Sequence, residues 1–181
     1  MIKKDKNIIL GVTASIAIYK APDIIRRLQD CACCVHVVMT KEAEELIRPI
    51  VFQSLSANRL YCGSMFDQQD AWDVEHVALA QKADLILIAP ATANIIAKLA
   101  AGICDDLLTC TVCATKAKVL IAPAMNENMY HNKITQNNIA KLKSCGYKFI
   151  GPNKGLLACG SVGTGCLAET AEIIKEVKKL L

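Results

Sequence analysis

The chain has 181 residues, of which 53% are hydrophobic and 21% are charged, and its formal net charge is +4. This length and composition predict a single domain over residues 1–181 with a core of its own, and the mild charge with only 4% aromatic residues excludes an extended nucleic-acid surface. The most apolar stretch, residues 85–101, is interrupted by Pro90, Asn94 and Lys98, so we expect no membrane partner. Met1–Lys6 lead into a short strand rather than a signal peptide, which predicts a cytoplasmic protein.

Strand and helix patterns alternate along the chain. A strand at 7–12 is followed by a helix at 16–29, a strand at 35–39, a helix at 41–47 and a less regular stretch to 74. A helix at 75–81, a strand at 84–89, helices at 93–101 and 105–115 and a strand at 118–122 come next. After a loop, a helix at 132–144, a strand at 147–150, a glycine-rich loop at 151–168 and a helix at 169–180 complete the series. This order predicts a three-layer α/β fold with a doubly wound parallel sheet between helices.

Ten cysteines are present, and most of them lie in aliphatic or helical contexts. We therefore expect most of them to be small core residues rather than disulfide partners. The clusters 31–34 and 110–113 resemble metal or redox pairs, but the first opens a strand and the second has no matching ligand pair. We expect no metal.

Two hydrophobic runs end in the same way. Residues 85–89 run into Pro90 and then Asn94, and residues 119–122 run into Pro123 and then Asn126. Continuous aliphatic runs suit strands that are buried on both faces, and open parallel sheets bind ligands beyond the carboxyl ends of their strands. Because core packing does not require asparagine at both places, we expect the functional site there.

The first predicted strand leads into residues 11–17, which are small or hydroxylated. Thr13 or Ser15 can cap the next helix, and free amides there suit a phosphate, although a simple helix cap is the alternative. The dinucleotide fingerprint is absent, and the second strand ends at Thr40 instead of a ribose-binding carboxylate. FMN therefore fits better than NAD.

Two further residues are candidates for chemistry. His76 begins a helix and is either a surface residue or an acid, base or carboxylate ligand that titrates near neutral pH. Cys159 lies in a helix-free, glycine-rich segment, where its thiol is either a mobile proton donor or nucleophile, or a buried anchor.

Together these segments resemble the homo-oligomeric flavin-containing cysteine decarboxylases, particularly the branch that acts on phosphopantothenoylcysteine. Residues 90–94 (Pro-Ala-Thr-Ala-Asn) look like the family's Pro-Ala-Ser-Ala-Asn motif, and residues 123–130 look like its Pro-x-Met-Asn-x-x-Met-Trp motif. Residues 157–160 look like its substrate-clamp cysteine segment, and His76 falls where the family has its active-site histidine. Tyr130 replaces the usual tryptophan, and Cys166 stands where bacterial members often have arginine, which puts that loop contact in doubt.

The resemblance implies a Rossmann-like (flavodoxin-like) fold with a flavin at the strand tips. It implies contacts to FMN from Thr13, Ala14, Ser15, Thr40, Thr92, Ala93, Asn94 and Ala124. It also implies catalytic roles for His76, Asn126 and Cys159, with the histidine approaching from a neighbouring subunit of a homotrimer or of a dodecamer of trimers. Asn126 would hold the substrate carboxylate, while Met129 and Ala158 of the 157–165 loop would close over the cysteinyl group.

The implied reaction converts 4'-phosphopantothenoylcysteine to 4'-phosphopantetheine in coenzyme A biosynthesis. FMN would oxidise the thiol-bearing carbon to a thioaldehyde, which provides the electron sink for loss of carbon dioxide. Reduced FMN would return the hydride to the resulting enethiol while Cys159 donates a proton. A peptidyl-cysteine decarboxylase, a flavin prenyltransferase-like enzyme and a non-catalytic regulatory flavoprotein are the alternatives.

Overall fold

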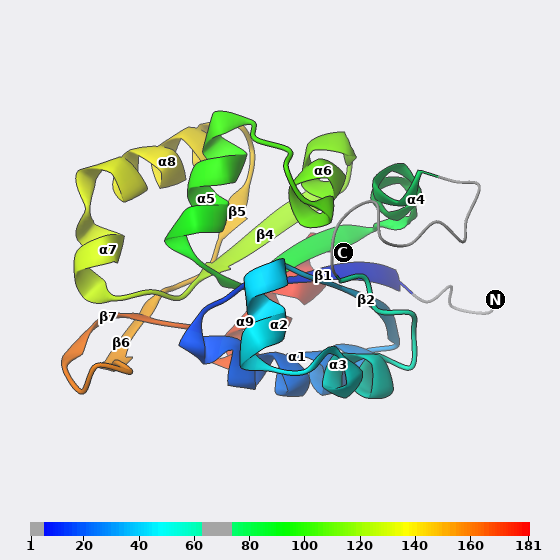
Figure 1. The fold of residues 1–181 in the computed structure, drawn as a ribbon, viewed down its shortest axis with the longest axis horizontal. Helices are drawn as coiled ribbons and strands as arrows, with labels where there is room; N and C mark the ends of the chain where they lie inside the picture. The colour runs from blue at the N-terminus through cyan, green and yellow to red at the C-terminus, as the bar shows by residue number, and fades with distance from the viewer. Residues whose placement is uncertain (1–5, 63–73) are drawn as a thin grey trace.

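The computed structural model describes residues 6–62 and 74–181, and its centre is a five-stranded parallel sheet (Figure 1). The strand order is β2-β1-β3-β4-β5. The strands are β1 (Lys6–Val12), β2 (Cys33–Met39), β3 (Leu85–Ala91), β4 (Lys118–Pro123) and β5 (Lys148–Phe149). This is the order of flavodoxin-like folds, so the predicted fold class is confirmed.

Helices cover both faces of this sheet, as predicted. One face packs against the 3-10 helix η1 (Ile16–Lys20) and against α1 (Ala21–Asp30), α2 (Lys41–Leu46), α3 (Pro49–Ser56) and α9 (Thr170–Leu180). The other face packs against α4 (Glu75–Lys82), α5 (Ala93–Ala101), α6 (Leu107–Ala114) and α8 (Lys133–Ser144). Successive residues of β1 alternate between the two cores, with Ile8 and Leu10 on the first side and Ile9 on the second, because strand side chains alternate between faces.

The predicted helix at 16–29 is wrong in its first turn. Residues 16–20 form a 3-10 helix capped by Ser15, whose Oγ accepts a hydrogen bond from the Ala17 N–H at 3.4 Å. The α-helix begins at Ala21, with Pro22 in its first turn. Proline has no N–H to give to a preceding turn and therefore favours a helix start at this point.

Three segments for which the sequence predicts no regular structure contain helices or strands. Helix α3 lies in the less regular stretch before residue 74 and begins at Pro49, and α7 (Glu127–His131) occupies part of the predicted loop after β4. The predicted glycine-rich loop contains no helix but does contain an antiparallel hairpin of β6 (Asn153–Leu156) and β7 (Val162–Cys166). Short elements of this kind lack a long apolar period, so the sequence pattern does not reveal them.

The outer edge of β2 is covered by the segment that follows α3. The Tyr61 N–H donates to the Val37 carbonyl at 3.0 Å, and the Met39 N–H donates to the Tyr61 carbonyl at 2.8 Å. The Asn58 side chain donates to the Val35 carbonyl at 3.1 Å. On the opposite side the sheet ends with β5, which has two residues.

The prediction that most cysteines are core residues is wrong. Only Cys33 is buried, while Cys104, Cys113, Cys145 and Cys159 are exposed and the other five are partly exposed. All ten are free thiols.

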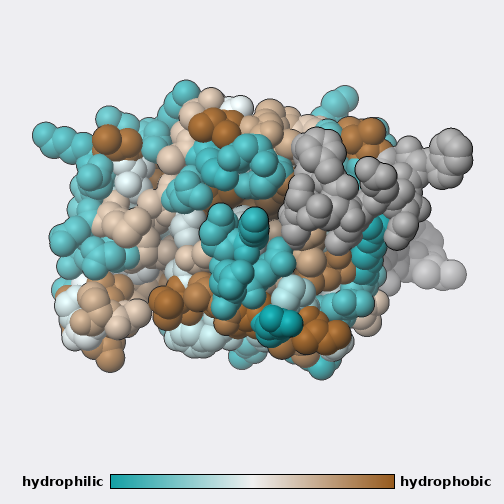
Figure 2. Space-filling view, in the orientation of Figure 1, coloured by the Kyte–Doolittle hydropathy of each residue, from teal (hydrophilic) through white to brown (hydrophobic). Residues whose placement is uncertain are grey.

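The outer surface mixes polar and apolar residues. In Figure 2, hydrophilic residues occupy the centre of the face, where Figure 1 places α2, and hydrophobic residues form separate areas around it. Within residues 6–62 and 74–181, no helix has both the length and the hydrophobicity that crossing a membrane requires. The same ranges contain no group of three or more His, Cys, Asp or Glu residues arranged to hold a metal ion.

Candidate functional site

The candidate site lies at the carboxyl ends of β1, β3 and β4. Strand order reverses between β1 and β3, because the chain runs outward from β1 to β2 and then returns to the other side at β3. In an open α/β sheet the crevice outside such a reversal is where ligands bind.

Thr13 joins the two strand tips at this reversal. Its side chain is buried, its hydroxyl donates to the Pro90 carbonyl at 2.7 Å, and the same oxygen accepts from the Thr92 N–H at 3.1 Å. One hydroxyl therefore satisfies both a donor and an acceptor of the β3–α5 turn. It fixes the distance between the segment after β1 and the start of α5.

Small and hydroxylated residues surround this link. Thr92 caps α5 through its hydroxyl, which accepts from the Ile95 N–H at 3.2 Å, and the cap leaves Ala93 and Asn94 in the first helical turn. The first N–H groups of a helix have no partner within it and favour anions. Thr40 is anchored at the β2 tip by its N–H, which donates to the Val12 carbonyl at 3.0 Å. The predicted residues Thr13, Ala14, Ser15, Thr40, Thr92, Ala93 and Asn94 thus lie on adjoining strand tips.

The tip of β4 lies beside that of β3. The Ala124 N–H donates to the Ala91 carbonyl at 2.9 Å, which places Ala124 next to the first half of the site. Asn126 then caps α7, with its Oδ1 accepting from the Asn128 N–H at 2.9 Å. The cap uses the oxygen of the Asn126 amide and leaves its NH₂ group directed elsewhere.

The β6–β7 hairpin docks on the β4 tip through its backbone. The Met125 N–H donates to the Gly165 carbonyl at 3.0 Å, and the Thr164 N–H donates to Glu127 Oε1 at 3.0 Å. A Cβ atom at Gly163 would collide with the Glu127 carboxylate, and one at Gly165 would collide with the Met125 carbonyl oxygen. Glycine is therefore required at 165, where the neighbour is backbone, whereas a side chain at 163 would displace the Glu127 carboxylate that holds the Thr164 N–H.

Hairpin docking brings Cys159 to Asn126. The Asn126 NH₂ group donates to Cys159 Sγ at 3.9 Å, and the Cys159 thiol shares a hydrogen bond with the Ser161 hydroxyl at 3.1 Å. The Ser161 hydroxyl, then the Ser161 backbone and the Asn126 amide, lower the pKa of Cys159 from its ordinary value of 9.0. The thiol is exposed, so it can meet a substrate.

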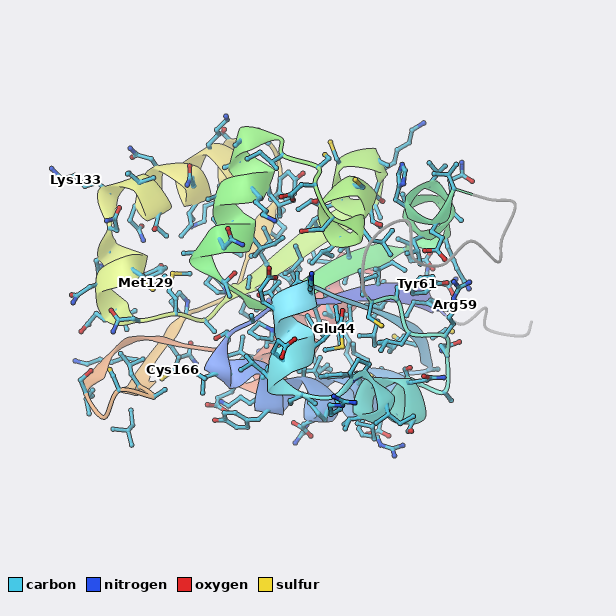
Figure 3. The ribbon with its side chains drawn as sticks, viewed as in Figure 1. Glu44, Arg59, Tyr61, Met129, Lys133 and Cys166 are labelled. Carbon is cyan, nitrogen blue, oxygen red and sulfur yellow. The ribbon has the colours of Figure 1, made fainter. Side chains whose placement is uncertain are left out.

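Met129 and Ala158 are both exposed, on α7 and on the turn between β6 and β7 respectively. Figure 3 shows Met129 on the helix above the hairpin that carries Cys166. Cys166 donates to the Leu156 carbonyl at 3.4 Å, so it makes a contact within the hairpin.

His76 is not brought to these residues within one chain. It lies on α4, which packs against α6 at the opposite end of the molecule from the hairpin (Figure 1). The Ala80 carbonyl of α4 accepts from the Thr115 hydroxyl, just before the amino end of β4. A role for this histidine at the strand tips would thus require a second copy of the chain.

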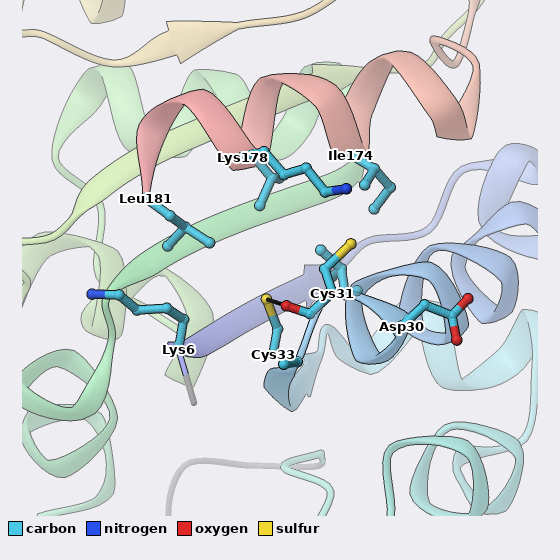
Figure 4. A pocket seen from close by; sticks show the side chains of 10 residues that line it. Lys6, Asp30, Cys31, Cys33, Ile174, Lys178 and Leu181 are labelled. Carbon is cyan, nitrogen blue, oxygen red and sulfur yellow. Dashed lines mark hydrogen bonds between the residues drawn. The ribbon is translucent and has the colours of Figure 1, made fainter. Parts of the chain in front are cut away.

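A pocket of about 520 Å³ lies at the amino ends of the strands, on the other side of the molecule from the candidate site (Figure 4). Its walls come from the beginnings of β1 and β2 and from the ends of α1 and α9, and Lys6, Cys31 and Lys178 reach its rim. None of the predicted site residues lines it. Folds of this kind bind ligands at the carboxyl ends of the strands, so this pocket is not where the ligand crevice is expected.

Sequence reasoning did not identify Glu127, Ser161, Gly163 or Gly165. A signal for the two glycines exists, because five glycines fall between residues 151 and 168 without any helical pattern. Nothing in the sequence pairs Glu127 with the Thr164 amide, since 37 residues separate them.

Comparison with known proteins agrees with this geometry. A model of the Flavoprotein family matches residues 2–181. A probable phosphopantothenoylcysteine decarboxylase from Streptococcus mutans is 45% identical over 178 residues, which cover 97% of this chain and 99% of the relative. A coenzyme A biosynthesis bifunctional protein from Bacillus subtilis is 44% identical over 175 residues, and the chain spans only 43% of that longer protein.

Solved structures share the whole fold. A cysteine-to-serine variant of a PPC decarboxylase complexed with pantothenoylaminoethenethiol superposes with a TM-score of 0.87 at 28% identity, covering 97% of this chain and 98% of the other. The FMN-dependent cysteine decarboxylase SpaF superposes with a TM-score of 0.83 at 29% identity, covering 97% of each chain. The ordered strand tips, the docked hairpin and these matches together show that this chain belongs to the Flavoprotein family.

Proposed function

We propose that this chain catalyses the FMN-dependent decarboxylation of 4'-phosphopantothenoylcysteine to 4'-phosphopantetheine. The observation that carries the proposal is the meeting of Asn126 and Cys159 beside the β1/β3 reversal, with the Asn126 NH₂ group 3.9 Å from the thiol. An amide donor suits a carboxylate, and a thiol beside it can deliver a proton to the same substrate. The names of the relatives at 45% and 28% identity point to the same substrate class.

The donor set at the strand tips fits FMN. A phosphate suits the hydroxyl of Ser15 and the N–H groups that open α5, and a flat ring suits the small side chains of Ala14, Ala93 and Ala124. Thr40 directly follows β2, at the place where an acidic residue would select a dinucleotide ribose. When bound, FMN supplies a reversible hydride acceptor.

The residues of the chain have separate tasks in this proposal. The Asn126 NH₂ group orients the carboxylate that is lost, while its Oδ1 is held by the cap of α7 and keeps the amide in one orientation. Cys159 donates a proton from Sγ when the saturated product forms. Its lowered pKa, caused first by Ser161, makes that donation easier near neutral pH. Met129 and Ala158 cover the apolar part of the substrate and exclude water.

His76 acts from a neighbouring copy in this proposal. Since α4 lies at the far end of the same chain, we infer a homotrimer, alone or within a dodecamer, in which the imidazole of one copy orients the carboxylate in the next. We also place the protein in the cytoplasm, because ten free thiols suit a reducing compartment.

Cys159 favours this function over peptidyl-cysteine decarboxylation, which ends at the enethiol. The test is to incubate the FMN-loaded protein with phosphopantothenoylcysteine and to follow carbon dioxide and phosphopantetheine by mass spectrometry. Wild type should give both. Cys159→Ser should release carbon dioxide but accumulate an oxidised enethiol product, whereas Cys145→Ser, which changes an exposed thiol after α8, should behave as wild type.

Two outcomes would contradict the proposal. If the FMN-loaded wild type forms neither product, the chain does not catalyse the proposed reaction. A full yield of phosphopantetheine from Cys159→Ser would remove the thiol from its role as proton donor.

A further inference from the structure

The β6–β7 hairpin is tied to the chain on both sides of Asn126. Before this residue, the Met125 N–H donates to the Gly165 carbonyl at 3.0 Å. After it, the Glu127 carboxylate accepts from the Thr164 N–H at 3.0 Å. The two links therefore join the residues that flank Asn126 to neighbouring residues of β7.

The link from Glu127 differs from the other because it uses a side chain. The carboxylate lies against the buried Gly163, where a Cβ atom would collide with it. Within residues 6–62 and 74–181, no basic side chain forms a salt bridge with Glu127, so the carboxylate is available to the Thr164 N–H. A charged acceptor makes a stronger hydrogen bond than a neutral one. This side chain is thus placed to restrain β7.

The hairpin transmits this restraint to Cys159. Its two strands pair in an antiparallel ladder, and Cys159 lies in the turn between them. The Leu157 N–H donates to the Ser161 carbonyl at 2.8 Å, and the Gly160 N–H donates to the Leu157 carbonyl at 2.9 Å. Because a turn closed by such bonds moves with its strands, the position of β7 determines how near the Cys159 thiol lies to Asn126.

We propose that Glu127 is a positioning residue that holds the hairpin where the Cys159 thiol can protonate the substrate. This inference rests on the proposed function. Glu127 does not touch the substrate in it and acts only through the Thr164 N–H. Asn126 is held separately, by its own cap of α7, so loss of the Glu127 carboxylate should displace the thiol and leave the carboxylate-binding amide in place. Glu127 therefore determines how much enethiol becomes phosphopantetheine.

Hydrogen–deuterium exchange of the FMN-loaded protein tests the link without any substrate. In Glu127→Ala, the peptide that contains Thr164 and Gly165 should exchange about tenfold faster than in wild type, because one of the two links is lost. Glu127→Gln keeps an oxygen that can accept from the amide, so it should restore most of the protection. Glu176→Ala is the matched control, since it removes a carboxylate that pairs with Lys179 within α9, and it should exchange as wild type does.

The ratio of the two products tests the positioning role. In a single turnover of phosphopantothenoylcysteine, Glu127→Ala should release carbon dioxide at close to the wild-type rate. Because a misplacement of about 1 Å can cost on the order of 100-fold in rate, it should form phosphopantetheine slower by about that factor and leave the enethiol in its place. Glu127→Gln should recover phosphopantetheine formation, and Glu176→Ala should give the wild-type ratio.

The two measurements separate the ways in which the inference can fail. Unchanged exchange in Glu127→Ala would show that the carboxylate does not hold the hairpin. Faster exchange with a wild-type product ratio, or an equal fall in both products, would overturn the positioning role. If the wild type forms neither product, the proposed function fails, whereas the exchange measurement still decides whether Glu127 restrains β7.

Discussion

Replacing Gly165 by alanine tests whether the docked hairpin positions Cys159. The new Cβ would lie closer to the Met125 carbonyl oxygen than the 3.0 Å that real Cβ atoms respect, and that neighbour is backbone. The hairpin would have to move by roughly 1 Å to regain ordinary contact. We expect the free energy of unfolding to fall by about 1–3 kcal/mol, the usual cost of overpacking a buried site.

The same movement should separate the Cys159 thiol from Asn126. Because a misplacement of about 1 Å can cost on the order of 100-fold in rate, phosphopantetheine formation should fall by about that factor. Release of carbon dioxide should fall less, since Asn126 belongs to α7 and not to the hairpin. Urea unfolding measures the first effect, and mass spectrometry of both products measures the second.

Gly155→Ala is the matched control, because it changes a glycine of the same hairpin. Its nearest neighbour would be Cys166 Sγ at 3.1 Å, which is a side-chain atom that can rotate away. This variant should lose no more than about 0.5 kcal/mol and should retain wild-type product ratios. If Gly165→Ala and Gly155→Ala gave equal rates and equal product ratios, the positioning role of the hairpin would be refuted.

Three other variants examine the rest of the site. Thr13→Val keeps the side-chain size but leaves the Pro90 carbonyl and the Thr92 N–H without their partner. Urea unfolding should therefore show that the free energy of unfolding falls by about 1–3 kcal/mol. An unchanged midpoint would contradict the link between the strand tips. Ser161→Ala removes the largest cause of the lowered pKa of Cys159. The pH profile of thiol alkylation by iodoacetamide should therefore shift upward, toward the ordinary pKa of 9.0. A downward shift would show that the serine does not stabilise the thiolate. His76→Asn should retain FMN, measured by its absorbance, but lose decarboxylation, and wild-type turnover of this variant would reject the role of the histidine. If subunits exchange, a mixture of His76→Asn and Cys159→Ser should form phosphopantetheine, which neither variant should form alone.

The parts of the fold that bury continuous apolar runs could be predicted from the sequence. The apolar runs that lead into Pro90 and Pro123 form strands β3 and β4, as predicted. The structure shows that these strands are neighbours in the sheet, with Asn94 and Asn126 following them at the same end of the sheet. Core burial determines these elements, and core burial is what hydrophobic periodicity records.

The hairpin could not be predicted in the same way. Its strands include glycines at 155, 163 and 165, and it docks through backbone amides and the Glu127 carboxylate instead of an apolar face. Contacts of this kind follow no period in the sequence. For the same reason the interaction between Cys159 and Ser161 was not identified, although Cys159 itself was.

Most cysteines were predicted to be buried, but the structure shows only Cys33 buried. Cysteine is among the residue types most often found buried, and the aliphatic neighbours of Cys104 and Cys113 favoured that interpretation. Their exposure follows from their positions, because Cys104 lies in the connection between α5 and α6, and Cys113 lies near the end of α6, after its last buried residue, Val112.

The blocked sides of the sheet limit how copies of this protein can associate. Tyr61 and Asn58 occupy backbone groups along β2, and β5 offers only two residues for pairing. A long, bare ladder of amides and carbonyls would invite intermolecular β-pairing and fibre growth. Over the part of the chain that the structure describes, association of copies through helical and loop surfaces is therefore favoured over pairing between sheet edges.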